Sequence, residues 1–510
     1  MIKRLRHHGL LIGVILVYVV LELSLLNWGL PNQKRIFTYH MDEWHSLMAI
    51  KSIWQQGTNN VAGAANGTMG HFLLSGLSII PLVLTRFIDI RLMGSAVTGL
   101  EMQRRIFQVL RLNTLMFGVL AALMVYLILK KHFRVKPSWG IVMLVFSPAW
   151  LVFSNYFRYD IALVFWILLA LWWMLRYGKD LKRSSYLWAG VATGLAIATK
   201  LSALPLLALY LFAFFYYSKR KKRDYRLLFW GLSVAGLVVV FWGMPDWLLG
   251  TGDYRRVIEM IGGLESMAEL LPGMSWWRYW LLIRLPASLG YGLVFGFLLA
   301  LVIRLRQREM KRDEFFLLIG LIFFLISLGY LKMAATSNRI LVLLPFLVII
   351  SGSVLTRKKA LAGLMILFAG VQMGQGWLRI RIKWQPDSRQ VASDWLEKEV
   401  PQGKVIGLEN IPIYQMIPDV LLKDFYWREH GLINELKYSY RIVEAQSESL
   451  PEVVVITNHD QTKRKSYKQK QALIERLEEE GYKEVASFSR EIAELDSIPS
   501  IISVFVKTLL

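Results

Sequence analysis

The sequence lacks cysteine altogether: none occurs among its 510 residues. This absence excludes disulfide bonds, thiolate metal sites and cysteine nucleophiles together. The segment from residue 385 onward also lacks a phosphate-binding loop and a Gly-rich dinucleotide turn. The missing cysteine is compatible with either side of a membrane and does not locate the protein.

Acidic residues are scarce before residue 385. The whole chain carries 60 Lys and Arg against 37 Asp and Glu, a net charge of +23, while residues 385–510 hold 16 basic and 21 acidic residues, which leaves about +28 on the first 384. Nucleic-acid-binding proteins gather such an excess into a patch on a folded surface. Here it lies in short runs between apolar stretches, which argues against a nucleic-acid partner and for membrane topology.

The apolar content is too high for a soluble protein. Hydrophobic residues make up 55% of the sequence and the mean hydropathy is +0.41, whereas soluble chains average about 45–50% apolar residues. The chain is therefore predicted to be a polytopic α-helical membrane protein. Stretches near the roughly 20 residues that cross a bilayer predict about 11 transmembrane helices, at residues 9–30, 110–130, 139–156, 160–176, 186–200, 203–218, 227–245, 280–303, 314–331, 339–355 and 360–378.

The positions of Lys and Arg predict the orientation of these helices. If the N-terminus is cytoplasmic, the cytoplasmic loops hold most of the basic residues, as the positive-inside rule requires: residues 130–138, 176–185, 219–226, 304–313 and 356–359. Residues 31–109, residues 246–279 and everything after 379 then face outward. We expect a plasma-membrane protein surrounded by membrane lipids. Its first apolar run is interpreted as a retained span, because it lacks the small-residue cleavage site of a signal peptide.

Two domains are expected. Residues 1–384 form a transmembrane module, with its first outer loop at 31–109 and its second at 246–279, and residues 385–510 form a soluble α/β domain on the outer face. The pattern of this domain predicts, in chain order, a helix, two strands, a charged helix and a closing strand, at 388–399, 405–408, 452–458, 465–481 and 501–507. No motif in it indicates a chemistry.

The first outer loop contains the most distinctive polar cluster. Asp42 and Glu43 are adjacent carboxylates at the start of an amphipathic helix, with His40 and His45 beside them. One interpretation is that Asp42 caps the helix and Glu43 complements its dipole. Another is a carboxylate general base at the membrane face that activates an acceptor hydroxyl. A divalent metal bound by these four residues is a third interpretation; we do not adopt it, and expect no cofactor.

Charged residues also collect where the predicted spans meet the outer surface. Arg158 and Asp160 form a turn before the fourth span, Lys200 ends the fifth, Arg284 lies just inside the eighth and Arg339 begins the tenth. Taken singly, each is also explained as an interfacial charge that reaches for water. Because the short loops on this side are otherwise poor in charge, their shared position indicates a site for an anionic lipid headgroup.

In this order, these residues resemble a known family. An outward Asp-Glu pair follows the first span, an Arg/Asp turn precedes the fourth, and the segment GLAIATK and an Arg-x5-Pro element follow later. The arrangement is similar to the GT-C superfamily of polyprenyl-phosphate-sugar glycosyltransferases, near the protein O-mannosyltransferases and the lipid A aminoarabinose transferases. The resemblance covers about residues 10–355, and it implies a GT-C type of membrane fold.

The resemblance also implies an inverting transfer of a sugar from a polyprenyl-phosphate donor to a hydroxyl of a protein, lipid or glycan, without a redox or nucleotide cofactor. By this analogy Asp42 is the general base and Glu43 helps to hold acceptor or donor. Candidates for gripping the donor phosphate are Arg158, Lys200, Arg339 and Arg284; candidates for substrate contact are Asp160, His45, His71 and Tyr39. His71 departs from the family pattern, because Phe72 and Leu73 replace the rest of an expected His-Gly-Pro-like element.

Two other functions stay open at this point. A transporter or lipid flippase would need polar residues through the bilayer midplane, whereas the predicted spans are almost bare of ionisable groups. A ligase or polymerase of lipid-linked glycans would share the outward-facing site. A transferase accounts for both the outward cations and the carboxylates opposite them, since fixed cations stabilise a phosphate leaving group and a carboxylate deprotonates the acceptor.

Overall fold

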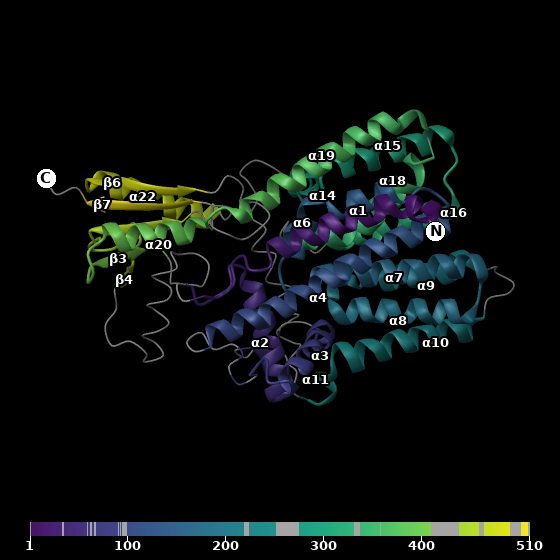
Figure 1. Cartoon of the computed structure of the whole chain (residues 1–510), viewed down its shortest axis with the longest axis horizontal. Coiled ribbons are helices and arrows are strands. Elements are labelled where there is room, and N and C mark those ends of the chain that lie inside the picture. Colours follow the sequence, from purple (N-terminus) through teal and green to yellow (C-terminus); the bar gives the residue numbers. More distant parts are fainter. Residues whose placement is uncertain are drawn as a thin grey trace.

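The computed structural model describes residues 2–32, 35–58, 60–61, 64–65, 68–89, 91, 93, 99–218, 224–250, 275–330, 337–357, 359–409, 438–457, 464–489 and 501–507. Figure 1 shows a bundle of helices with a β-sheet unit beyond one end and the N-terminus at the other end. Much of the predicted second outer loop, 251–274, and residues 219–223 of one predicted inner loop lie outside the described residues.

Each apolar stretch predicted as a span is helical over most of its length. In chain order the helices of the bundle are α1 (Ile2–Ser24), α4 (Leu100–Leu127), α5 (Ser138–Val145), α6 (Pro148–Ser154), α7 (Tyr159–Asp180), α8 (Arg183–Thr199), α9 (Pro205–Tyr217), α10 (Tyr225–Val238), α14 (Leu285–Leu289), α15 (Tyr291–Gln307), α16 (Arg312–Tyr330), α17 (Ser337–Ile340), α18 (Leu344–Leu355) and α19 (Ala362–Ile380). They share one large apolar core.

Fewer of these helices than predicted are long enough to cross a bilayer. Among the described residues, four continuous helices pass a test of length and hydropathy: Leu100–Phe133, Tyr159–Asp180, Tyr225–Gly243 and Ser337–Leu355. A bent pair, Tyr279–Leu289 with Tyr291–Gln307, makes a fifth if it is one span. The predicted number of about 11 spans is therefore not confirmed. One reason is interruption: the stretch predicted at 139–156 is divided into α5 and α6 just before Pro148, which suits the first turn of a new helix.

The bent pair turns by 115° between Leu289 and Tyr291. Gly290 lies at the bend with a φ of +100°, and a Cβ atom there would collide with the side-chain amide of Gln372 from α19. That amide donates to the carbonyl of Leu289 at 2.7 Å and accepts from the N–H of Leu293 at 3.1 Å. Gln372 thus satisfies backbone groups that a helix break would leave without partners in an apolar bundle.

Three further helices lie at the end of the bundle away from the N-terminus: α2 (Met41–Gln56), α3 (Gly70–Leu84) and α11 (Pro245–Leu248). The apolar face of α2, including Trp44, Leu47 and Ile50, is buried in a second core cluster with residues of α3 and α4. The apolar face that makes this helix amphipathic therefore packs on protein.

The C-terminal unit is built around a five-stranded sheet of order β4-β3-β5-β7-β6. Its strands are β3 (Val405–Leu408), β4 (Ser439–Ile442), β5 (Val453–Thr457), β6 (Tyr482–Ser489) and β7 (Ile501–Lys507). β4, β3 and β5 are parallel to one another. β7 is antiparallel to both of its neighbours, β5 and β6. The strands predicted at 405–408, 452–458 and 501–507 correspond to β3, β5 and β7; β4 and β6 were not predicted.

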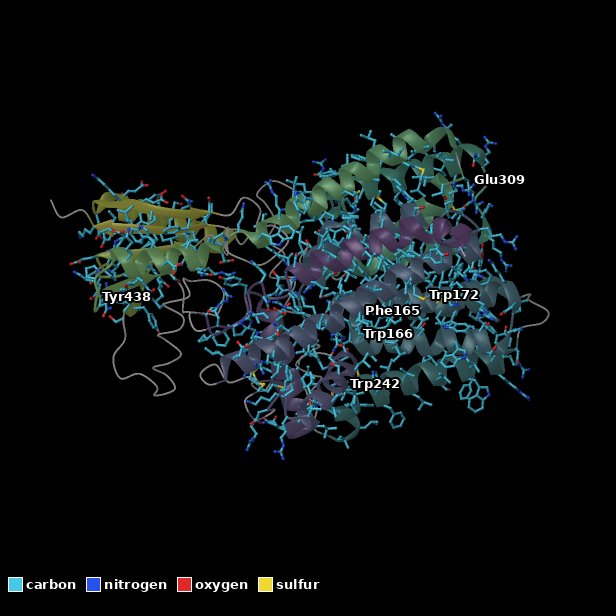
Figure 2. The ribbon with its side chains drawn as sticks, in the orientation of Figure 1. Phe165, Trp166, Trp172, Trp242, Glu309 and Tyr438 are labelled. Atoms are coloured by element: carbon cyan, nitrogen blue, oxygen red, sulfur yellow. The ribbon has the colours of Figure 1, made fainter. Side chains whose placement is uncertain are left out.

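Helices cover both faces of this sheet. Val453 and Val455 of β5 join the core cluster that contains α20 (Ser388–Glu399), whereas Val454 and Ile456 join the cluster that contains α22 (Arg464–Glu479). This alternation is what a strand buried on both faces requires. Figure 2 shows Tyr438 inside this unit, where its hydroxyl donates to the carbonyls of Leu396 and Val400 at the end of α20, at 2.8 and 3.0 Å.

The sheet unit and the first outer loop share a hydrophobic core. One cluster of buried residues includes Leu30, Phe37 and Trp44 from the loop together with Leu396 of α20 and Val504 of β7. The boundary predicted at residue 384 thus separates two segments whose apolar residues pack together.

Candidate active site

The site is organised around the first turn of α2. His40 is the residue before the helix, in extended backbone, and its ring approaches the Asp42 N–H through Nδ1 at 3.2 Å. Asp42 therefore does not cap the helix, which was one interpretation of the sequence. Its side chain is 44% exposed and forms an ion pair between Oδ2 and Nη2 of Arg158 at 2.8 Å.

Arg158 links three acceptors and is itself buried. Its Nε lies 2.9 Å from Oδ2 of Asp160, and its Nη1 lies 2.9 Å from Nε2 of His40. Arg158 only donates, so it requires Nε2 of His40 to accept; the Asp42 N–H makes the same demand on Nδ1. A neutral imidazole accepts at only one nitrogen, so one of these two contacts is a hydrogen bond in a given tautomer.

A second cation completes the cluster. Nζ of Lys200 lies 2.7 Å from Oδ1 of Asp160. Both basic residues occupy extended backbone at a helix end, Arg158 just before α7 and Lys200 just after α8, and the packing of these two helices brings them together. Arg339, half-buried in α17, interacts electrostatically with Asp42 and Asp160. Three cations thus face two carboxylates, and the cluster carries a net positive charge.

Asp42 is ionised across the physiological pH range. Burial alone would raise the pKa of Asp42, but its interactions with nearby basic groups, first Arg158 and then His40, His45 and Lys200, outweigh burial and lower the pKa to about 2. Burial likewise lowers the pKa of His45, one turn further along α2, against the opposing charge of Asp42. A half-exposed carboxylate ringed by cations can accept a hydrogen bond from a hydroxyl that approaches from solvent.

Glu43 points away from Asp42 into the protein. It is fully buried, and its two oxygens accept from Nε and Nη2 of Arg111, both at 2.8 Å. Oε1 also accepts from the Phe157 N–H at 2.9 Å. Arg111 donates further to the carbonyls of Leu26 and Trp28 at 2.9 and 2.7 Å. Glu43 therefore occupies a closed structural pair rather than a surface open to substrate.

Arg111 was not predicted from the sequence, although a signal was available. It is a cation inside the apolar stretch predicted at 110–130, and ionisable groups in such stretches usually have a dedicated partner. Among the described residues, no three His, Asp or Glu side chains converge as a metal site requires. Since both oxygens of Glu43 bind Arg111, the metal-binding interpretation of this cluster gains no support.

Two further predicted site residues, His71 and Arg284, contact aromatic side chains. His71, at the start of α3, is buried and stacks on Phe157 with ring centroids 5.4 Å apart. Burial lowers the pKa of His71 to about 4, against the charge of Asp160, and no described residue hydrogen-bonds its Nδ1. Arg284 donates through Nε to the hydroxyl of Tyr279 at 2.6 Å.

Tyr39 is 3% exposed and packs between Arg35 and Arg389. The structure thus gives the Tyr39 ring a packing position between two basic residues, and its contact with substrate stays a prediction.

Part of the chain matches a known protein family, and its fold is similar to several solved structures. Residues 96–244 match the family model of the dolichyl-phosphate-mannose-protein mannosyltransferases; this segment contains Arg111, Arg158, Asp160 and Lys200. The sequence comparison with curated proteins gave no match. Among solved structures the chain is similar to ArnT from Cupriavidus metallidurans bound to undecaprenyl phosphate, with 13% identity and a TM-score of 0.49 over 98% of both chains.

Two more solved structures are similar over part of their own length. The oligosaccharyltransferase of Archaeoglobus fulgidus in the apo form is 16% identical, with a TM-score of 0.45 over 79% of this chain and 59% of that chain. The arabinofuranosyltransferase AftD from Mycobacteria is 12% identical, with a TM-score of 0.44 over 99% of this chain and 40% of that chain. The family match confirms, for residues 96–244, the resemblance to the GT-C superfamily of polyprenyl-phosphate-sugar glycosyltransferases.

Proposed function

We propose that this protein is an integral membrane glycosyltransferase that moves a sugar from a polyprenyl-phosphate donor to an acceptor hydroxyl on the extracytoplasmic face. The observation that carries the proposal is the Asp42 cluster: one accessible carboxylate held against basic side chains, at the end of the bundle that we propose faces outward. The matched family is named for a dolichyl-phosphate-linked sugar donor, which agrees with a site that binds a phosphate.

The chemical step requires one base and several cations. The acceptor oxygen attacks the anomeric carbon, the bond from that carbon to the phosphate oxygen breaks, and polyprenyl phosphate leaves. In our proposal Asp42 takes the acceptor proton, and the sugar configuration inverts because attack comes from the face opposite the leaving group. Arg158, Lys200 and Arg339 stabilise the negative charge that grows on the phosphate, and Asp160 holds Arg158 and Lys200 in place.

The low pKa of Asp42 connects donor binding to proton abstraction. A carboxylate with a pKa of about 2 is a weak base, and general bases work best when their pKa lies near the operating pH. A phosphate that binds Arg158 and Lys200 would neutralise the cations that hold this pKa down. We therefore propose that Asp42 becomes a stronger base once the donor is bound, which favours transfer over abstraction of protons from water.

Glu43 has a different role in this scheme. Because its carboxylate is closed off by Arg111, we propose that Glu43 fixes the position of Asp42 and does not contact acceptor or donor. His71, buried beside the cluster, is proposed to support Phe157 rather than to touch substrate. The excess of Lys and Arg in the predicted inner loops supports a cytoplasmic N-terminus, with the cluster and the C-terminal unit outside.

The proposal can be tested with purified protein in lipid nanodiscs. The full chain is incubated with labelled polyprenyl-phosphate sugars and membrane extract, and the products are identified by mass spectrometry. Wild-type protein should transfer label, and Asp42→Asn should lower the rate by about 10²–10⁴-fold. Asp89→Asn is the matched control, because Asp89 lies in the same outer loop and also pairs with an arginine, Arg91, at 2.9 Å. Wild-type rates in Asp42→Asn would remove the base assignment, and no transfer from any donor would remove the function.

A further inference from the structure

The segment that joins the bundle to the sheet unit runs directly past the proposed active site. α19 ends at Ile380, a short 3₁₀ turn covers Arg381–Trp384, and α20 begins at Ser388. Figure 1 shows α19 leading out of the bundle toward α20 and the sheet. Two cations of this segment, Lys383 and Arg389, are buried, with 4% and 1% of their surface exposed. Buried cations are rare unless a specific set of partners holds them.

Arg389 packs on the residue that precedes His40. Its guanidinium lies 3.7 Å from the centre of the Tyr39 ring, and Arg35 covers the same ring at 4.0 Å. Asp387 fixes Arg389 through two contacts, from Nε at 2.7 Å and from Nη2 at 3.0 Å. The ring of Tyr39 is therefore enclosed between two guanidinium groups, an arrangement that favours a planar cation over the face of an aromatic ring.

The backbone around Tyr39 is fitted to this arrangement. The Tyr39 N–H donates to the carbonyl of Gly29 at 3.0 Å. Gly29 has a φ of +68°, and a Cβ atom there would lie 2.8 Å from the Tyr39 ring. A side chain at position 29 would thus push the ring off Arg389, and only glycine accommodates both the close approach and the left-handed backbone.

Lys383 packs against two further aromatic rings, those of Tyr156 and Trp28, which lie near Tyr39. Its Nζ donates to the carbonyl of Val152 at 3.0 Å and lies 3.9 Å from the ring centre of Tyr156 and 5.0 Å from that of Trp28. Trp28 in turn lies 5.3 Å from Tyr39 and 6.1 Å from Tyr156, centre to centre. The two cations and three rings form one contiguous packed unit.

This unit contacts the proposed active site through His40. The His40 ring lies 4.7 Å from that of Tyr156 in an edge-to-face contact, and His40 follows Tyr39 directly in the chain. On its other side His40 contacts Nη1 of Arg158 and the N–H of Asp42. A shift of Tyr39 or Tyr156 therefore displaces His40, and with it the geometry of the Asp42–Arg158 pair.

We propose that Arg389 and Lys383 are positioning residues for sugar transfer, so that the segment entering the C-terminal unit completes the scaffold of the active site. The inference rests on the proposed function. Neither residue touches substrate; both act through Tyr39, Tyr156 and His40. The C-terminal unit is then a structural part of the catalytic module, and any displacement of that unit is transmitted to Asp42.

The experiment compares Arg389→Gln with a matched control in the full chain. Arg304→Gln removes the cation of another buried ion pair, in which Arg304 contacts Glu314 at 2.6 Å. This pair is far from the proposed site: Glu309, which lies between the two residues in the sequence, is at the end of the bundle away from the sheet (Figure 2). Arg389→Gln should lower kcat by about 10–100-fold and leave the donor KM within about two-fold. Arg304→Gln should leave kcat unchanged at a temperature where both variants stay folded.

Two substitutions of Tyr39 separate packing from substrate contact. Tyr39→Phe keeps the ring between the guanidinium groups and should retain wild-type kcat, whereas Tyr39→Leu should reproduce the loss seen in Arg389→Gln. The double variant of Tyr39→Leu and Arg389→Gln should lose no more than the worse single variant, because both changes disrupt the same contact. Equal losses in Tyr39→Phe and Tyr39→Leu, or multiplied losses in the double variant, would overturn the inference.

A second readout is independent of catalysis. Residues 38–46 include the N–H of Tyr39, which donates to Gly29, and the N–H of Asp42, which contacts His40. Hydrogen exchange of the amides in these residues should be about ten-fold faster in Arg389→Gln and unchanged in Arg304→Gln. Unchanged exchange together with wild-type kcat refutes the positioning role while the proposed function stands. If wild-type protein transfers no sugar, the proposed function fails, and the exchange result alone decides whether Arg389 positions this loop.

Discussion

Replacing Glu43 with glutamine tests how strongly the buried Glu43–Arg111 ion pair stabilises the fold beside the proposed active site. Glutamine keeps Oε1, which accepts from the Phe157 N–H and from Nε of Arg111. It places an NH₂ group where Oε2 accepts from Nη2 of Arg111 at 2.8 Å. Two donors then face each other, and the charge of Arg111 stays buried without its carboxylate.

The size of the effect follows from the burial of both partners. Glu43 is 0% and Arg111 1% exposed, so solvent does not screen the loss, and breaking such a pair from one side destabilises a protein by about 3–5 kcal/mol. Arg111→Met should be at least as harmful, because it leaves a buried carboxylate and removes the donors to Leu26 and Trp28. In the double variant the loss in free energy of unfolding should be about 2 kcal/mol smaller than the sum of the losses in the two single variants, because no unpaired charge is left.

The assay is the free energy of unfolding in mixed micelles, measured by titration with SDS and followed by fluorescence of the 19 tryptophans. All three variants are compared with wild type under one detergent condition. A loss below about 1 kcal/mol in Glu43→Gln would be typical of a surface substitution and would refute the closed pair. Strict additivity in the double variant would show that Glu43 and Arg111 do not interact in the folded protein.

The remaining predictions concern pH, the phosphate cations and donor binding. The pKa of Asp42 in the folded protein lies near 2, below its ordinary 3.8. The extra free energy of unfolding that Asp42 gives wild type over Asp42→Asn should therefore be complete above pH 3.8 and lost as the pH falls through 2. Unfolding measured at a series of pH values tests this. Arg339→Ala should weaken binding of a polyprenyl phosphate more than binding of the acceptor; equal donor affinity, with the exposed Arg91→Ala as control, would exclude a phosphate role. Lys200→Met should lower kcat, because the leaving phosphate loses one of the cations that would stabilise it; a normal rate would contradict the proposed stabilisation of the leaving group.

The sequence predicts well which charged residues gather in one place, and predicts poorly which residues pair. Arg158, Asp160 and Lys200 were placed at one membrane face because they interrupt apolar stretches near their outer ends, and the structure joins them through direct contacts. That result follows from a one-dimensional signal, since a charge in an apolar run must lie near water or a partner. The same signal was present for Arg111, yet its partner Glu43 lies 68 positions away in the chain, and no spacing rule connects them.

Tyr39 illustrates a second limit. The family resemblance suggested a substrate contact for Tyr39 and gave no sign of its packing between guanidinium groups from residues 35 and 389. Similarly, β6 was missed because its residues alternate weakly and are mostly exposed; its identity as a strand comes from pairing with β7. Both features depend on tertiary neighbours, which a local pattern does not contain.

The bend at Gly290 has a consequence for how the protein is made. The side chain that satisfies the broken backbone comes from Gln372, which lies 79 residues after Leu293 in the chain and is therefore synthesised later than the bend. A continuous helix pairs the Leu293 N–H without help from another segment, as the interior of a membrane favours. The segment from 279 to 307 should therefore enter the bilayer as a single rod and fold back only when α19 arrives. We therefore expect the bend of this segment to form only after insertion, with α19 as the late component that stabilises it.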